Sequence, residues 1–280
     1  MTSIQLRSTI QTYVNLARQT VTNIRIQIYV LFVFAVSWSY WVPEALHALG
    51  IRELARDPSR TFSVVAVWTP AIATLLIYAV YRDQKAFSNL ISRLTKWRVG
   101  WLWYAIAIVL PIFMPVASIF ISRLIFGSAP QPHFMRLDTD LVILQFLIPF
   151  LVYAIPNAIF AEIGWRGFLQ KELDTTLPVV VSGTVVGIIW GLWRIPTWLN
   201  SHAEFIELLL LFLSIIKTGV LYAWLHKKAG GSLVPLIVLH AMINLTGEFI
   251  GEIPIVEPVM WIVVVWLIVL EEHGPNGQHG

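Results

Sequence analysis

The chain has no cysteine, and it carries few charged residues for its length. Of its 280 residues, 12% are Asp, Glu, Lys or Arg, whereas a soluble domain usually has about 25%. The missing cysteine excludes disulfides, thiolate metal sites and a cysteine nucleophile. The shortage of charge, together with 57% hydrophobic residues and a mean hydropathy of +0.73, excludes an ordinary soluble domain and indicates an integral membrane protein.

The two ends of the chain differ from its apolar middle. The first 25 residues lack the short apolar core and small-residue cleavage site of a cleavable signal peptide. Their apolar positions are spread among polar ones, which predicts a cytoplasmic segment over 1–25 that is either an interfacial amphipathic helix or a frayed tail. Residues 271–280 are polar and glycine-rich, which predicts a disordered tail. No internal repeat or second domain is visible, so 26–270 is expected to form a single membrane domain.

Long apolar runs fill that membrane domain. A helix needs roughly 20 apolar residues to cross a bilayer, and about eight runs come close to that length. The fold class predicted is therefore all-α, a polytopic integral membrane bundle of about eight transmembrane helices. The expected spans are 26–43, 62–81, 101–122, 141–161, 177–199, 205–226, 232–250 and 255–270.

The distribution of Lys and Arg predicts the orientation of the bundle. Short loops that carry an excess of these residues face the cytoplasm. The N-terminus and the second, fourth and sixth connections hold twelve of them, and the other connections hold five. Both termini are therefore expected in the cytoplasm. The net charge of +3 is attributed to this topology, and no nucleic-acid partner is expected.

Three segments place polar side chains inside apolar helices. They hold Glu162 with Arg166, Arg194, and His240 with Asn244. Each of the two pairs is spaced i, i+4, so its members share one face of a helix. A charge at bilayer depth costs at least ~2.5 kcal/mol, and a functional site is the default hypothesis for it. A carboxylate can take a proton from water, an imidazole can shuttle protons or bind a metal, and a carboxamide can donate to an oxyanion.

Plainer interpretations stay open for each residue taken alone. Glu162 and Arg166 are explained equally well as a structural ion pair at a helix end. His240 fits a hydrogen-bonded core histidine, and Asn244 fits an interhelical hydrogen bond. Arg194 can snorkel to an interface or pair with a nearby acid.

Together the three segments resemble the motifs of the CPBP family of intramembrane proteases. This family includes the CAAX prenyl endopeptidases of the Rce1 type and bacterial bacteriocin-processing and self-immunity proteins. The motifs read Glu-Glu-x-x-x-Arg followed by Gly-Phe-Leu, aromatic-Gly-Leu-Trp-His-x-Pro, and His-x-x-x-Asn. The matching positions are Glu162, Arg166, Gly167, Phe168, Leu169, Trp190, Gly191, Leu192, Trp193, Pro196, His240 and Asn244. The resemblance places the core of the domain at 141–250.

Two positions depart from the family pattern. The first glutamate of the first motif falls on Ala161, and the histidine of the second motif falls on Arg194. In the family, that glutamate is thought to activate the attacking water with help from the histidines. Alanine cannot take a proton, and arginine stays protonated at neutral pH. Glu162 is turned by ~100° from position 161, so it is not expected to substitute.

A metal site is poorly supported by what remains. A catalytic zinc uses about three protein ligands, and only His240 with Glu162 or Asn244 is on offer. A zinc ion would therefore be under-liganded, and no cofactor is expected with certainty.

The resemblance implies an intramembrane endopeptidase that acts on membrane-tethered or prenylated peptides, in contact with membrane lipid and in the plasma membrane of a prokaryote. The two replacements predict a weak or inactive enzyme. The alternatives are a pseudoprotease acting as a peptide-binding or bacteriocin-immunity membrane protein, and a transporter or lipid-handling protein supported only by Arg194 and Lys217 within spans. The motif helices are expected to surround a cavity open to the cytoplasmic side. Arg194 is expected there either to pair with Glu162 or to bind an anionic group.

Overall fold

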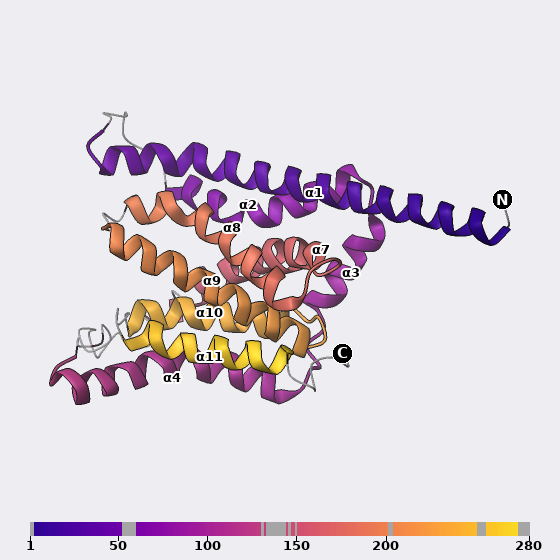
Figure 1. Cartoon of the computed structure of the whole chain (residues 1–280). Helices are drawn as coiled ribbons and strands as arrows, with labels where there is room; N and C mark the ends of the chain where they lie inside the picture. The colour runs from indigo at the N-terminus through magenta and orange to yellow at the C-terminus, as the bar shows by residue number, and fades with distance from the viewer. Residues whose placement is uncertain are drawn as a thin grey trace.

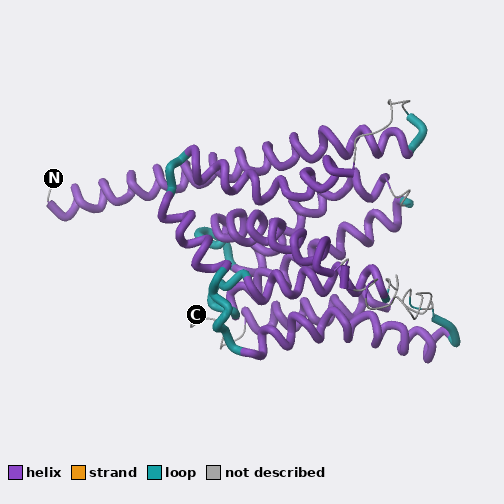
Figure 2. Tube along the Cα trace, turned by 180° about the vertical axis from the view of Figure 1, so that it is seen from behind, coloured by secondary structure: helices purple, strands orange, loops and turns teal. Residues whose placement is uncertain are grey.

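The structure is a computed structural model, and it is described here for most of the chain. The described residues are 3–51, 60–129, 132, 144, 147–148, 150–200, 204–250 and 256–273. Throughout these ranges the regular structure is helical (Figure 2). The predicted all-α fold is therefore confirmed.

The helices follow one another with short connections. They are α1 (Ser3–Ala48), α2 (Arg60–Val80), α3 (Gln84–Leu94), α4 (Trp101–Phe126), the π-helical η2 (Phe150–Ala154), α6 (Ile155–Gly164), the π-helical η3 (Trp165–Gln170), α7 (Lys171–Leu173), α8 (Val179–Asn200), α9 (Phe205–Lys228), α10 (Val234–Phe249) and α11 (Val256–His273).

The long helices lie side by side in one bundle, with α1 along one edge and α4 along the other (Figure 1). Within it α8 packs on α9 and α1, α2 packs on α1 and α6, and α10 packs on α4 and α6. α1 begins and α11 ends at the same end of the bundle, as the expected topology requires. That end also holds α3 and α7.

Helix length separates the expected spans into classes. Four helical stretches in the described ranges are long and apolar enough to cross a membrane, and two more apolar helices are shorter. The four are Gln19–Ala48, Trp101–Phe126, Val179–Asn200 and Phe205–Lys228, and the shorter two are Val65–Val80 and Val234–Phe249. α11 carries three glutamates within 18 residues, which keeps it out of both groups. The expected span 141–161 lies partly outside the described residues.

Two expected boundaries differ from the structure. Residues 3–25 are not a separate segment, because they form one continuous helix with the first span (Figure 1). This helix has 46 residues, or ~69 Å at 1.5 Å per residue, and it extends beyond the rest of the bundle. The polar tail was expected to begin at 271, but Glu271 and Glu272 belong to α11. Residues 274–280 lie outside the described part.

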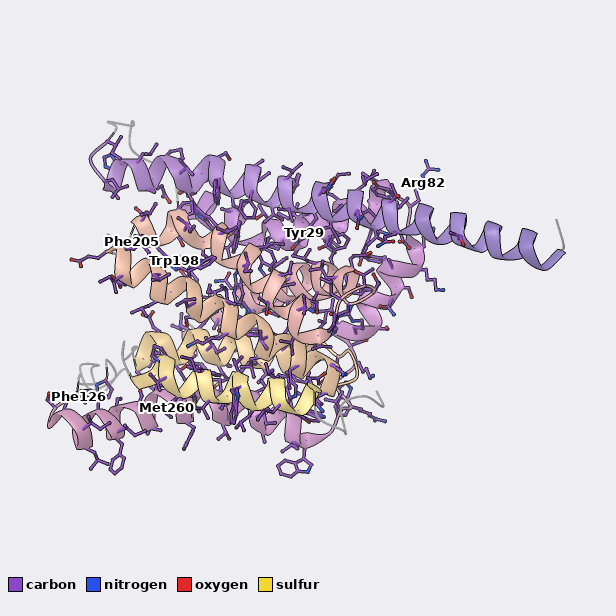
Figure 3. All side chains as sticks on the ribbon, in the orientation of Figure 1. Tyr29, Arg82, Phe126, Trp198, Phe205 and Met260 are labelled. Atoms are coloured by element: carbon purple, nitrogen blue, oxygen red, sulfur yellow. The ribbon has the colours of Figure 1, made fainter. Side chains whose placement is uncertain are left out.

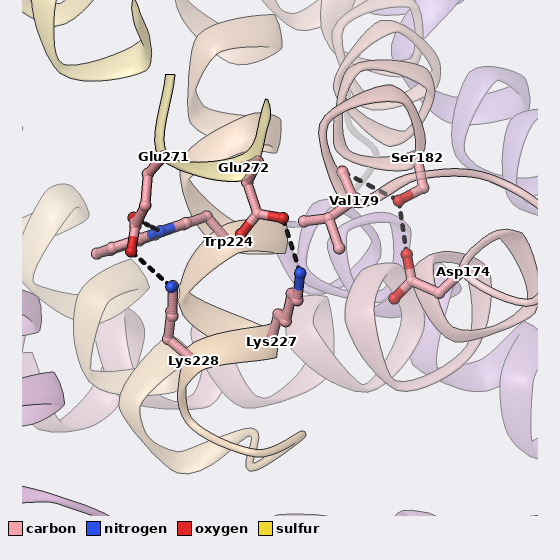
Figure 4. Close-up of polar contacts among 8 residues, drawn as sticks. All are labelled: Asp174, Val179, Ser182, Trp224, Lys227, Lys228, Glu271 and Glu272. Carbon is pink, nitrogen blue, oxygen red and sulfur yellow. Dashed lines mark hydrogen bonds and ion pairs between the residues drawn. The ribbon is translucent and has the colours of Figure 1, made fainter. Parts of the chain in front are cut away.

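Those two glutamates hold the last turn of α11 against α9 (Figure 4). Glu271 accepts hydrogen bonds from Lys228 Nζ at 2.6 Å and Trp224 Nε1 at 2.8 Å, and Glu272 accepts one from Lys227 Nζ at 2.8 Å. The bonds from Lys228 and Trp224 lower the pKa of Glu271 below its ordinary value.

A second polar group ties the start of α8 to the turn before it. The Ser182 hydroxyl donates to Asp174 at 2.5 Å, and Gln170 Nε2 donates to Asp174 and Ser182 at 2.6 Å each (Figure 4). Burial raises the pKa of the Asp174 carboxyl, although these two hydrogen bonds oppose the shift. The connection between η3 and α8 is therefore fixed by side chains as well as by the backbone.

A glycine stripe lets α8 and α9 approach closely. Gly183, Gly187 and Gly191 recur every four residues along α8, so they lie on one face. A Cβ at Gly187 would lie 2.7 Å from Ile216 Cα, and one at Gly183 would lie 2.7 Å from Ala223 Cβ. Stripes of small residues are the usual way in which membrane helices pack closely. This contact positions the two helices that carry Arg194 and Tyr222.

Gly187→Ala is expected to lower the free energy of unfolding by about 1–3 kcal/mol, because the added methyl forces the two backbones apart. Gly247→Ala on α10 is the matched control, since a Cβ there meets nothing within 4 Å. Unfolding by titration with sodium dodecyl sulfate in mixed micelles measures both changes. Equal stability of the two variants would show that the stripe does not set the distance between the helices.

Candidate functional site

The first motif lies on α6 and η3, which run on from one another as a buried helix. Gly164 ends α6 against α2, where a Cβ would collide with the Pro70 side chain and lie 2.5 Å from its backbone carbon. Every residue of η3 is buried. π-helical turns of this kind occur frequently at functional sites. The predicted continuation of the helix through Glu162 is confirmed, and its π-helical geometry was not foreseen.

Glu162 and Arg166 form the predicted ion pair inside the bundle. Arg166 Nη1 lies 3.1 Å from Glu162 Oε1, and both side chains are completely buried. The guanidinium also lies over two aromatic rings, 4.0 Å from the Tyr222 centroid and 4.8 Å from the Trp190 centroid. Cation–π contacts of this sort strengthen when they are shielded from water. The charge of Arg166 is therefore held by one carboxylate and two rings.

His240 of α10 joins the same carboxylate. Its Nδ1 lies 2.7 Å from Glu162 Oε1. An ionised carboxylate can only accept, so Nδ1 donates and Nε2 is left as the acceptor nitrogen. The imidazole also packs between Trp190 and Tyr222, with ring centroids 5.6 and 5.9 Å away. The structure thus brings the first and third motifs together.

A cavity of about 610 Å³ adjoins this ion pair. Its wall includes Ala161, Arg194, His240 and Asn244, which come from α6, α8 and α10. Glu162 is not part of the wall, because it is turned away from Ala161 and lies buried behind it. The positions of all three motifs therefore meet at one cavity, and both replaced positions face it.

Arg194 does not pair with Glu162, so that alternative is wrong. Glu162 is taken by Arg166 and His240. Arg194 is half-buried on the cavity wall, and its guanidinium has no hydrogen bond or ion pair with the residues that the structure describes. Asn244 lies on the same wall as His240, as their spacing predicts.

The cavity lies in the half of the bundle opposite to the one expected. Its wall runs from Ala161 and Tyr222 to Trp198 and Glu248, near the C-terminal ends of α8 and α10. Trp198 lies at the end of the bundle away from Arg82 (Figure 3). Since the end with Arg82 is the one rich in Lys and Arg, the expected opening toward the cytoplasmic side is wrong in its direction.

The donors near the ion pair are few for a metal. Among the described residues, no three His, Cys, Asp or Glu side chains lie close enough to hold a metal ion together. Glu162 and His240 make two donors, where a catalytic zinc uses about three. Asn244 adds no printed contact to them. The residues present do not fit a zinc site.

Lys217, which the sequence left without a role, lies outside this site. Its Nζ is 5.1 Å from the centroid of the Trp261 ring on α11. It lines a separate small hollow that also includes Glu257. Its charge therefore has local partners, and it does not enter the motif cavity.

Two functional contacts were missed from the sequence. Tyr222 lies against Arg166 and His240, and nothing in its surroundings on the chain signals this. Arg93 of α3 was counted only as a loop cation. It is buried, and it donates to the carbonyl oxygens of Arg166 (2.9 Å), Gly167 (3.1 Å) and Gly231 (2.9 Å).

Arg93 also lies 2.6 Å from His226 Nε2 on α9. Because arginine only donates, His226 Nε2 accepts this bond and the imidazole is neutral. Burial lowers the pKa of Arg93 below its ordinary value, yet arginine remains charged at neutral pH. Arg93 thus fastens η3 to the connection between α9 and α10, and it fixes the two helices that carry Glu162 and His240.

Comparisons with known proteins agree with this geometry. Residues 143–246 match the family of type II CAAX prenyl endopeptidase Rce1-like proteins. The chain is 24% identical over 259 residues to CAAX prenyl protease 2 of Methanococcus maripaludis, covering 87% of this chain and 93% of that protein. It is 21% identical over 224 residues to lysostaphin resistance protein A of Staphylococcus haemolyticus, covering 80% of this chain and 57% of that protein.

Proposed function

Because the chain belongs to the CPBP family, which includes the Rce1-like CAAX endopeptidases, we propose that it holds membrane-tethered peptides in the motif cavity and hydrolyses them slowly or not at all. Prenylated peptides are one class of such substrates, in keeping with the name of the methanococcal relative. The protein works in the plasma membrane of a prokaryote, with the end rich in Lys and Arg in the cytoplasm.

One observation carries this proposal. Ala161 occupies the cavity wall beside His240 and Asn244, while the neighbouring carboxylate of Glu162 is buried and engaged by Arg166. Hydrolysis of a peptide bond needs a base that can take a proton from water within hydrogen-bond reach. Alanine has none, and Arg194 supplies a fixed positive charge where the family pattern has an imidazole. The shape for peptide binding is kept, and the water-activating groups are not.

The remaining polar residues suit a bound peptide. His240 presents Nε2 as an acceptor, because its Nδ1 is bonded to Glu162. Asn157, Asn244, Ser214 and Thr218 also line the cavity. Their amide and hydroxyl groups can satisfy backbone N–H and C=O groups of an extended segment, which a peptide in an apolar cavity requires.

The test uses the purified chain in liposomes with a fluorescent peptide anchored by a lipid chain. We expect saturable binding of the peptide and little or no cleavage over hours. His240→Ala is expected to change binding and to leave the background cleavage as it is. Rapid cleavage that disappears in His240→Ala would overturn the proposal and identify a working enzyme with a rearranged base.

A second candidate is a membrane protein that confers immunity by binding a peptide without cutting it. The similarity to lysostaphin resistance protein A favours it. The same assay separates the two, because an immunity protein shows no cleavage at all under any variant of His240. A host made resistant to a bacteriocin by the uncleaving chain would support this candidate.

A further inference from the structure

Arg194 differs from the other arginines in the interior of the bundle. Arg166 is paired with Glu162, Arg25 with Asp83 at 3.1 Å, and Arg93 with backbone carbonyls. The guanidinium of Arg194 has no such partner in the described part of the chain, and it faces the cavity. A fixed cation in an apolar wall strongly favours a ligand that brings a negative charge.

The surroundings of Arg194 are aromatic and apolar. Trp190 and Trp198 are four residues away on either side, so they share its face of α8 and line the cavity with it. Leu211 and Ile215 of α9 lie on the same wall. The cavity volume of about 610 Å³ lies within the ~300–1,000 Å³ typical of small-molecule sites. The space therefore combines one positive point with an apolar lining.

The position of Arg194 along α8 suits an amphiphile that enters from the membrane surface. It precedes Asn200, the end of α8, by six residues, or about 9 Å along the helix axis. The cavity continues from there toward Ala161 and Thr218, deeper in the bundle. Glu248 is the one acid among the described lining residues, and it forms no ion pair with Arg194. A headgroup at Arg194 would leave an acyl chain pointing into the apolar part.

We propose that the motif cavity is a binding site for an anionic single-chain amphiphile, whose carboxylate or phosphate pairs with Arg194 and whose chain lies against Trp190, Trp198 and Ile215. Such a ligand occupies the same space as a peptide, so it competes with peptide binding. The site does not depend on any hydrolytic activity of the chain, and it stands or falls separately from the function proposed above.

The test measures equilibrium binding to the full chain, immobilised in a neutral detergent, by scintillation proximity. The probes are radiolabelled palmitate, lysophosphatidate and monopalmitoylglycerol, which present a carboxylate, a phosphate and no charge. We expect palmitate or lysophosphatidate to bind saturably, and Arg194→Gln to weaken that binding about tenfold or more. The anion that loses more affinity identifies the headgroup. Monopalmitoylglycerol is expected to bind weakly and equally to both proteins.

Arg123→Gln is the matched control, because it removes the same charge from an exposed site on α4 outside the cavity. It is expected to bind palmitate as the unchanged protein does. Should Arg194→Gln fail to fold, ionic strength provides a second test, since added salt should weaken the binding of the anions and leave the neutral probe unaffected. Unchanged anion affinity in Arg194→Gln, equal affinity for the neutral probe, or no saturable binding of either anion would overturn the proposal.

Discussion

Restoring both family residues, by Ala161→Glu together with Arg194→His, is expected to raise peptide hydrolysis about 10²–10⁴-fold over the unchanged chain. The new carboxylate would arise on the cavity wall, where it can reach a water molecule near a bound peptide. The imidazole at 194 would remove the fixed charge that otherwise neutralises such a base. A carboxylate beside a permanent guanidinium has a lowered pKa and is a poorer proton acceptor.

The two substitutions are expected to act together. Ala161→Glu alone should give a smaller gain, because Arg194 remains able to pair with the new carboxylate. Arg194→His alone should give little, because no carboxylate faces the cavity. Residues that work as a unit in catalysis are strongly non-additive. The rate of cleavage of a lipid-anchored peptide by the four proteins, measured at equal amounts of folded protein, gives the size of this coupling.

Ala154→Glu with Arg194→His is the matched control. Ala154 also lines the cavity, two helical turns before position 161, so the same charge enters the same space at a different depth. It is expected to stay inactive. Equal activity of this control and the restored protein would mean that any acid in the cavity suffices. No gain in the restored protein would show that the replacements are not what limits hydrolysis.

The parts of the site that follow from local geometry could be predicted from the sequence. Glu162 and Arg166 pair because residues four apart lie on one face of a helix. His240 and Asn244 share the cavity wall for the same reason. The step from separate helices to one site, however, came from the family resemblance. Spacing alone does not say which helix faces which.

What could not be predicted depends on contacts between distant segments. Arg93 looks like an ordinary loop cation, and its role becomes visible only when α3 folds against η3 and Gly231. Tyr222 is one of several aromatic residues in an apolar helix. The side on which the cavity lies was also mispredicted, because charge counts in loops fix orientation and say nothing about packing density within the bundle.

Replacing Glu162 by glutamine is expected to lower the free energy of unfolding by about 3–5 kcal/mol, which is the usual cost of removing one partner of a buried ion pair. Arg166 would keep its charge, completely buried, with the rings of Tyr222 and Trp190 as its main remaining partners. His240 would also lose the acceptor that fixes its Nδ1 tautomer. Unfolding by sodium dodecyl sulfate titration measures the change.

Glu271→Gln is the control for the loss of an ion pair at the surface. Its partner Lys228 lies 2.6 Å away, and both side chains are partly exposed to solvent. Such pairs contribute about 0–1 kcal/mol, so the control should lose far less stability than Glu162→Gln. A similar small loss in both proteins would contradict a buried, water-free pair at Glu162.

The double variant Glu162→Leu with Arg166→Met separates the cost of an unpaired charge from the net worth of the pair. Replacing both charges by apolar side chains is often neutral or even stabilising. We therefore expect the double variant to recover most of the stability that Glu162→Gln loses. It should nevertheless bind the lipid-anchored peptide less well, because His240 then has no carboxylate to hold its Nε2 toward the cavity. Recovery of stability with loss of binding would mean that the pair is kept for orienting the imidazole, and recovery of both would reduce it to an ion pair that only closes the helix.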